Sequence, residues 1–391
     1  MTYEEMKAAV FAEIQKYSEE MTALSDRMAD EPELSGREFN TSRGITELLK
    51  KHGYTTEYPF AGKQTAFRAV YGDNSRKHKA ALLVEYDALP DLGHACGHCL
   101  SGAAGILAAL ALRPLQDVLD TDIHIIGTPD EENDGAKCYM AADGVFDGYD
   151  LAIMTHMYDK NLVMPRFQAL GEFFYEFRGQ AAHASAAPWE GRNALNGVQL
   201  MMHAIDMLRQ HTRPDAQFHG VIKDGGVFPN IVPERAELHL FIRAGDKRYM
   251  EELVRLTDDC ARGAATATQT EWKRKPQEQT YYVDLRRNEA GEAALREVFT
   301  ELGIKENAPA DTLFGSSDIG NVSYACPAFH PCLQITDGVP IHTREFEQAV
   351  RTDRAHKAIA TAARIMALHI AKIFGDKETL SAVRADFTKD Q

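Results

Sequence analysis

The sequence has few of the features that would direct a protein to a membrane or a nucleic acid. Across its 391 residues we find no apolar run of the roughly 18–20 residues needed to span a bilayer. The first residues lack the basic start and apolar run of a signal peptide. Positive charge is scarce, because 43 Lys and Arg stand against 58 Asp and Glu, for a net charge of -15. We therefore expect neither a membrane nor a nucleic acid as a partner.

Cysteine is also scarce and has no regular spacing. The six cysteines do not form the evenly spaced framework of a disulfide-rich secreted domain, so we expect reduced thiols and a cytoplasmic protein. Four of them, Cys138, Cys260, Cys326 and Cys332, are expected to be packing residues. The length is sufficient for two domains with a substantial core.

What the chain does have is an alternation of helix and strand. Helical spacing of apolar residues covers about 3–29 and 36–52, and short apolar runs at 80–84, 123–127 and 151–155 indicate strands. Each of these strands ends in a cluster of polar residues. Because open α/β sheets bind ligands outside the carboxyl ends of their strands, the clusters are expected to share one crevice.

The pattern changes near Gly171. From there to about Tyr281 the expected order is β-α-β-β-α-β, which is the ferredoxin-like pattern. We therefore predict an α/β catalytic domain with a central mixed sheet, made of residues 1–170 and 282–391, and an inserted α+β domain over 171–281. One long helix is expected over about 345–373. The polar tail after Gly375 is expected to fray.

The most informative segment is the strand-to-helix turn Gly93–Gly102. It carries Cys96 and His98, and a thiolate and an imidazole on a Gly-hinged turn suit a transition metal. The alternative is a turn of small residues in which both side chains only pack. Cys99, three residues after Cys96, is a second thiol that could serve instead.

Three further clusters lie at predicted strand or helix ends. Glu131 and Glu132 follow the strand at 123–127, and adjacent carboxylates on a turn can divide into a metal ligand and a general base. His156 follows the strand at 151–155, and His342 precedes the last helix. Each alone is more simply explained as a solvated loop or a hydrogen-bonded histidine, but their joint occurrence favours a metal site.

The sequence resembles the metal-dependent aminoacylase/carboxypeptidase family of amidohydrolases. The resemblance is strongest to the branch that holds aminobenzoyl-glutamate hydrolase, the indole-acetyl-amino-acid hydrolases and the β-alanyl-dipeptide peptidases. Motifs in family order run along nearly the whole chain: Glu31–Ser35, Glu85–Pro90, Gly93–His98, Gly127–Glu132, Ala182–Ser185, Pro188–Gly191, Pro229–Pro233, Gly315–Ser323 and His342.

The resemblance implies a site for two divalent metal ions. The matching ligand positions are Cys96, His98, Glu132, His156 and His342. Glu131 matches the general base, and Asp87 matches a residue that orients a ligand. Cys99 and Asp130 depart from the family pattern, which has Asn or Asp at the first position and often Ala at the second. A thiolate favours zinc, with manganese or cobalt as alternatives.

The resemblance also implies a homodimer that forms through the inserted domain. His183 matches a residue that reaches the active site of the partner subunit. Asn230 and Arg243 resemble a pair that binds the carboxylate of the substrate, and Ser316 is a further candidate for substrate binding.

The implied activity is hydrolysis of the amide bond of an N-acyl or N-aroyl amino acid or a small dipeptide. A dipeptidase or aminopeptidase on the same scaffold is the alternative, because these motifs do not encode the group before the scissile bond. A small-molecule-binding protein without activity is a third interpretation. The presence of Glu131 beside the candidate ligands weighs against it, because a binding protein has no need of a base.

Overall fold

A computed structural model describes residues 1–276, 281–307 and 315–389. The chain divides into two compact units. The catalytic unit comprises residues 1–166, 285–307 and 318–389, and the inserted unit comprises residues 167–276, 281–284 and 315–317. No feature of the sequence had indicated that residues 315–317 belong with the inserted unit.

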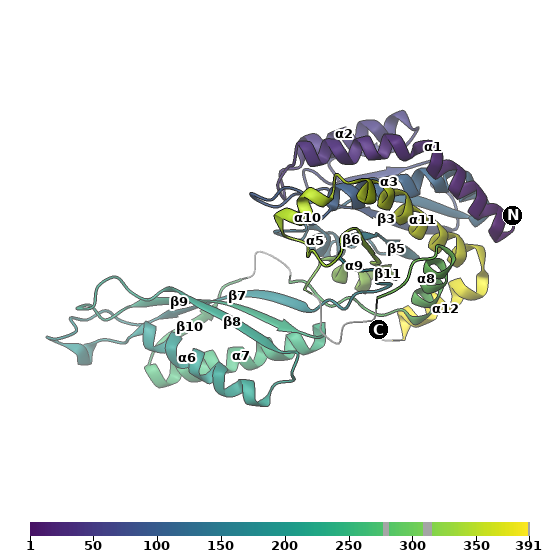
Figure 1. Ribbon diagram of the computed structural model, residues 1–391. Helices are drawn as coiled ribbons and strands as arrows, with labels where there is room; N and C mark the ends of the chain where they lie inside the picture. Colours follow the sequence, from purple (N-terminus) through teal and green to yellow (C-terminus); the bar gives the residue numbers. More distant parts are fainter. Residues whose placement is uncertain (277–280, 308–314, 390–391) are drawn as a thin grey trace. The chain divides into compact units, whose positions relative to one another are not determined.

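The catalytic unit is built on a six-stranded mixed sheet of order β1-β2-β4-β3-β5-β11 (Figure 1). The three central strands are parallel, because β3 pairs in parallel with both β4 and β5. These strands are almost entirely buried and rich in Ala, Leu and Ile, as expected for parallel strands covered on both faces. The strands span Thr55–Glu57 (β1), Phe67–Val70 (β2), His78–Val84 (β3), Thr121–Gly127 (β4), Leu151–Ile153 (β5) and Ala328–Phe329 (β11).

A second, two-stranded sheet pairs β6 (His156–Tyr158) in parallel with β12 (Cys332–Gln334). The predicted strand at 151–155 is therefore two elements, since β5 ends at Ile153 and β6 begins at His156. His156 thus lies at the start of a strand of its own.

The helices of the catalytic unit surround the main sheet, and α3 lies directly on β3 and β4 among α1 and α11 (Figure 1). Every residue of α3 is buried, which explains its run of Ala, Leu and Gly. These helices span Tyr3–Asp30 (α1), Phe39–Lys51 (α2), His98–Leu112 (α3), Gln116–Leu119 (α4), Ala136–Ala142 (α5), Glu289–Glu301 (α8), Ile319–Ala325 (α9), Arg344–Ala349 (α10), Asp353–Gly375 (α11) and Lys377–Thr388 (α12).

Two helical spans, His98–Leu119 and Asp353–Gly375, contain an 18-residue window apolar enough to cross a membrane by composition. This corrects our expectation that no stretch is long enough. Of these windows, 89% and 72% respectively are buried inside the fold. Burial in the core therefore accounts for their apolar composition.

Two predictions for the C-terminal region were wrong. The single long helix over 345–373 is two helices, because Thr352 accepts a hydrogen bond from the amide of Ala355 and caps a new helix, α11. The tail after Gly375 does not fray but forms α12, capped by Asp376. This helix buries Leu380 and Val383, and Arg384 Nε donates to Asp150 at 3.0 Å. Its two buried apolar residues are too sparse a signal to stand out in a polar stretch.

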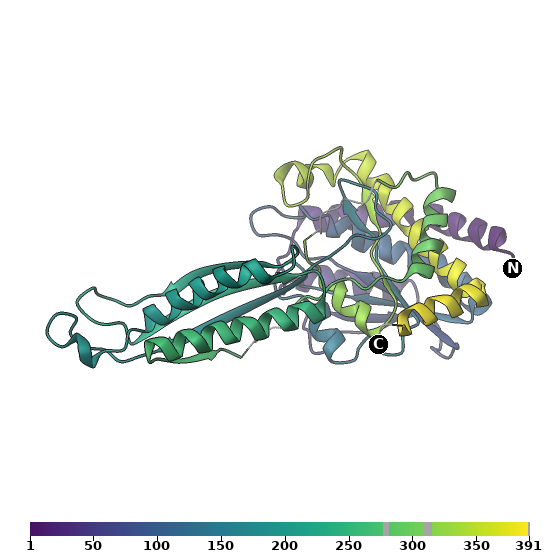
Figure 2. The ribbon, with the colours of Figure 1, turned by 90° about the horizontal axis from the view of Figure 1, so that it is seen from below.

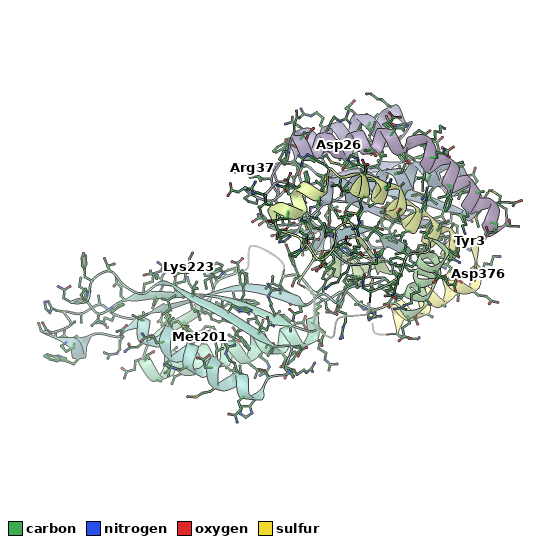
Figure 3. All side chains as sticks on the ribbon, viewed as in Figure 1. Tyr3, Asp26, Arg37, Met201, Lys223 and Asp376 are labelled. Atoms are coloured by element: carbon green, nitrogen blue, oxygen red, sulfur yellow. The ribbon has the colours of Figure 1, made fainter. Side chains whose placement is uncertain are left out.

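The inserted unit has the predicted β-α-β-β-α-β order, and its antiparallel sheet has the ferredoxin-like strand order β10-β7-β9-β8. Its long helices lie side by side along one face of this sheet (Figures 1 and 2). Met201 on α6 is fully buried in the core between helices and sheet, whereas Lys223 on β8 is exposed (Figure 3). The elements span Ala169–Arg178 (β7), Ala194–Leu208 (α6), Gln217–Asp224 (β8), Arg235–Ala244 (β9), Lys247–Thr268 (α7) and Glu271–Arg274 (β10).

Candidate metal centre

The ends of β3, β4 and β5 bring the predicted clusters to one edge of the sheet, as the parallel topology requires. Glu85 and Asp87 follow β3, Glu131 and Glu132 lie in the turn after β4, and His156 follows β5. Asp87 joins these segments, because one of its carboxylate oxygens accepts from the amide of Glu132 at 3.0 Å.

The turn before α3 supplies Cys96 and His98. Gly97 lies between them with φ of 82°, in the left-handed region, and a Cβ there would lie 3.0 Å from Cβ of Met157. Glycine at this position therefore lets the turn carry a thiol and an imidazole toward His156. Cys96 Sγ lies 3.4 Å from His156 Nε2.

Four groups of side chains in the described part of the chain have ligand atoms within 4.8 Å of one another. Three of these groups share members and together contain all five predicted ligands. We call Cys96, His98, Glu132, His156 and His342 the candidate metal centre.

The histidines are oriented with one ring nitrogen toward this centre. His98 Nδ1 donates to Asp87 Oδ1 at 2.9 Å, so its Nε2 faces inward. His156 Nδ1 donates to the backbone oxygen of Met157 at 2.7 Å. His342, with a positive φ of 63°, is anchored by its amide to Ala95 O at 2.9 Å. Its Nε2 lies 3.3 Å from Glu132 Oε1.

The donor atoms fit divalent cations. Within the described residues, His98 Nε2 and Glu132 Oε1 are buried without a hydrogen-bond partner, and such atoms are expensive unless a ligand satisfies them. Burial and the charge of Glu132 raise the pKa of the Cys96 thiol well above its usual value. A thiolate at this depth needs the positive charge of a metal ion.

Cys99 is placed differently from Cys96. It lies within α3, is fully buried and belongs to none of the groups of candidate ligands found among the described residues. Burial raises the pKa of its thiol to about 11. The geometry therefore favours Cys96 over Cys99 as the ligand.

Glu131 lies beside the candidate metal centre and also beside a second group of carboxylates. Its ligand oxygen is within 4.8 Å of those of Glu85 and Asp318, and likewise of His98 and Glu132. Burial raises the pKa of Glu131 well above its usual value, and the charges of Glu132, Asp318 and Glu85 raise it further. A carboxyl with a raised pKa is a better proton acceptor once it is ionised.

The remaining predicted residues lie in the inserted unit, at two opposite ends of its sheet. His183 and Asn230 lie together, because the amide of Ala184 donates to Asn230 O at 3.0 Å and His183 bridges Ile231. Arg243 is at the other end, where its Nη1 donates to Ser316 Oγ at 3.2 Å.

The structure does not bring Asn230 and Arg243 together within one chain. Asn230 precedes β9, and Arg243 is eight residues beyond Arg235, the first residue of that strand. At about 3.3 Å per residue this is about 26 Å. Two residues so far apart cannot bind one carboxylate of a small substrate from the same chain.

Sequence reasoning missed several side chains at the site. Lys137, fully buried at the start of α5, pairs with Glu85 and Asp318. The ring of His330 stacks on that of His156, with centroids 5.3 Å apart. Glu85 and Asp318 lie in matched motifs, but no feature of the sequence indicated that Lys137 or His330 would be buried beside them.

Known proteins resemble this chain over nearly its full length. A model of the peptidase dimerisation domain matches residues 169–266. The Xaa-Arg dipeptidase of Mus musculus is 32% identical, with 98% of this chain and 92% of that protein covered. One of the two p-aminobenzoyl-glutamate hydrolase polypeptides of Escherichia coli is 29% identical, with 95% and 92% covered.

Solved structures show the same fold at lower identity. An aminohydrolase structure from methicillin-resistant Staphylococcus aureus superimposes with a TM-score of 0.79 at 17% identity, covering 93% of this chain and 98% of that one. A Bacillus subtilis protein described as a dinuclear metal binding peptidase gives a TM-score of 0.70 at 17% identity, with 92% and 99% covered. With the relatives above, these findings show that the chain belongs to the M20 family of metal-dependent peptidases and amidohydrolases.

Proposed function

We propose that this M20 hydrolase cleaves the amide bond of small dipeptides and N-acyl or N-aroyl amino acids at the candidate metal centre. The observation that carries the proposal is the convergence of five metal-ligating side chains and Glu131 at the carboxyl edge of one sheet. The named activities of the relatives, on Xaa-Arg dipeptides and on aminobenzoyl-glutamate, support this class of substrate.

The candidate metal centre would hold two divalent ions, zinc or manganese, with cobalt as an alternative. Bound there, such ions polarise a carbonyl and lower the pKa of water towards neutrality. Glu131 accepts the proton of the attacking water and passes it to the leaving amine. Asp87 holds His98 in one orientation through its hydrogen bond to Nδ1. Arg243, with Ser316 beside it, binds the carboxylate of the substrate.

The most direct test is a hydrolysis screen with zinc, manganese or cobalt added. It would compare Xaa-Arg and Xaa-Lys dipeptides, other dipeptides, aminobenzoyl-glutamate and N-acyl amino acids. Because the Xaa-Arg dipeptidase matches over nearly the full length, we expect the highest kcat/KM with a basic C-terminal residue. No cleavage of any of these amides by the metal-loaded protein would contradict the proposal.

We further propose that the active protein is a homodimer joined through strand β8. This strand lies at one edge of the sheet, and no described strand pairs with its outer side. Val221 and Ile222 on it are 57% and 42% exposed. Unpaired edges of this kind attract a second strand, and antiparallel pairing of two β8 strands gives a two-fold interface.

A dimer also explains the separation of Asn230 from Arg243. In a two-fold dimer, His183 and Asn230 of one protomer can serve a site that contains Glu131 and Arg243 of the other. Exposed apolar residues near this end of the sheet, Trp189, Val227, Phe228 and Ile231, are consistent with burial against a partner.

Mixing inactive variants tests the shared site. His183→Ala and Glu131→Gln should each be nearly inactive alone. After the protomers exchange, some heterodimers would hold one complete site, so activity should return to about half the wild-type value per heterodimer, since one site of two is whole. Ile222→Lys should weaken the dimer in light scattering. If mass analysis shows exchange and no activity returns, the shared site is wrong.

A further inference from the structure

Lys137 is a fully buried lysine that the proposed hydrolysis does not use. Its Nζ lies 2.6 Å from Glu85 Oε1 and 2.6 Å from Asp318 Oδ1. Its backbone amide also donates to Asp318 Oδ2, at 3.0 Å. All three side chains are at most 1% exposed. The ammonium is therefore held between two carboxylates by short contacts in the interior of the catalytic unit.

These two carboxylates, with that of Glu131, form what we call the carboxylate trio: Glu85, Glu131 and Asp318. Their ligand oxygens lie within 4.8 Å of one another, a separation that could hold a metal ion. Three carboxylate oxygens are hard ligands, of the kind that manganese and magnesium prefer. Without a positive charge between them, three buried carboxylates would repel one another strongly.

The carboxylate trio adjoins the candidate metal centre. Glu85 Oε2, on the side away from Lys137, lies 3.3 Å from His98 Nε2. Glu131 is a member of the trio and also lies within 4.8 Å of the ligand atoms of His98 and Glu132. A divalent ion that enters the catalytic unit would thus meet two neighbouring sets of donors.

The charge of Lys137 is secured by its partners. Burial alone would lower the pKa of Lys137, but the charges of Asp318 and Glu85 outweigh burial and hold this pKa above its usual value. The side chain thus carries a full positive charge at any pH at which the protein is folded.

We propose that Lys137 is a positioning residue whose ammonium occupies a third cation position, within the carboxylate trio, and so confines divalent ions to the candidate metal centre. This inference rests on the metal centre of the proposed function. Without the ammonium, the trio takes up a divalent ion. Glu131 then serves as a ligand of that ion and no longer accepts a proton.

The test is to count metal ions bound to the purified full-length chain. Lys137→Met keeps most of the side-chain length and removes the charge. After equilibrium dialysis against manganese, elemental analysis should give two ions per chain for the wild type and three for Lys137→Met. A new class of bound Mn²⁺ should appear in electron paramagnetic resonance. Because Glu131 is engaged, kcat should fall by about 10²–10⁴-fold, with KM nearly unchanged.

The matched control is the double variant Lys137→Met/Asp318→Asn. It removes one positive and one negative charge and dismantles the trio, so it should bind two ions. A folded Lys137→Met chain that still binds two ions would overturn the inference and leave the proposed function intact. A wild-type chain that binds none would overturn both.

A folding defect in Lys137→Met would also be informative. If the unpaired trio prevents folding, millimolar manganese should restore the fold of Lys137→Met, measured by circular dichroism. The double variant should fold without that addition. If manganese does not restore the fold, Lys137 acts only as a structural counter-ion and the inference is wrong.

Discussion

The two units of the chain treat charged side chains in opposite ways. In the catalytic unit, Lys137, Glu85 and Asp318 are at most 1% exposed. In the inserted unit, Arg178, Arg235 and Lys273 gather around Glu176 with side chains that are 61%, 45% and 56% exposed. Buried pairs are costly to break, whereas exposed pairs contribute little because solvent screens them.

This difference shows where the chain concentrates its chemistry. A buried charge must be paired or bound to a ligand, so each one in the catalytic unit restricts its neighbours to one arrangement. The exposed charges of the inserted unit impose no such restriction on the sheet that carries them. Substitutions in the two units should therefore differ sharply in effect.

The largest effect is expected from the metal ligands. Cys96→Ala or His98→Ala each removes a donor atom from the candidate metal centre, so bound metal and activity should fall together. Cys99→Ala is the matched control and should keep near-normal metal content, since Cys99 contributes to no group of candidate ligands among the described residues. Elemental analysis with a parallel activity assay would decide it. The reverse result for the two cysteines would assign the ligand to Cys99.

The next effect separates chemistry from binding within the same unit. Glu131→Gln keeps the size of the side chain but cannot accept a proton. Turnover should fall by about 10²–10⁴-fold, while metal content stays at the wild-type value. Steady-state kinetics on the fully metal-loaded variant would measure this. Near-normal turnover would exclude Glu131 as the base.

Most of the architecture could be predicted from the sequence because it depends on local patterns. Buried parallel strands such as β3 and β4 appear in the sequence as short apolar runs, and the six elements of the inserted unit were predicted in their correct order. The break between α10 and α11 was missed because apolar spacing continues across it, and a single capping residue, Thr352, sets the new start.

The candidate site was predictable only where motifs carry it. The five ligands and Glu131 lie in matched segments, and strand ends explain why they meet. Lys137 was not predictable, because a lysine at the start of a helix is ordinarily solvated. Its burial depends on Glu85 and Asp318, the second of which is 181 residues away in sequence. The separation of Asn230 from Arg243 needed the length of β9, not the residue types.

Acid should affect the two units differently. Burial lowers the pKa of His124 and His369 in the catalytic unit to about 4, from an ordinary 6.5. Between these values the unfolded chain binds protons that the folded chain does not, so stability falls as pH drops from about 6.5 to 4. In the inserted unit, hydrogen bonds led by that from Arg178 lower the pKa of Glu176 to about 2, so its contribution is lost only below about pH 4.5.

Hydrogen exchange at pH 6.5 and 4.5, corrected for intrinsic rates, would measure this contrast. Amides of the catalytic unit should lose protection, and those of the inserted unit should change little. His124→Gln cannot gain a proton, so it should reduce the loss in the catalytic unit. Equal losses in both units would contradict the assignment of the effect to buried histidines.

The smallest effect is expected from the exposed charges of the inserted unit. Arg178 Nε donates to Glu176 Oε1 at 2.7 Å, but the arginine is 61% exposed, and Arg235 and Lys273 remain beside Glu176 when it is removed. Arg178→Ala should therefore lower the free energy of unfolding by less than about 1 kcal/mol. Activity and metal content should be unchanged. Denaturant unfolding would measure the change, with Arg235→Ala as the comparison because Arg235 also pairs with Asp224 and Glu237. A loss above about 2 kcal/mol for Arg178→Ala would mean that this network behaves like a buried one.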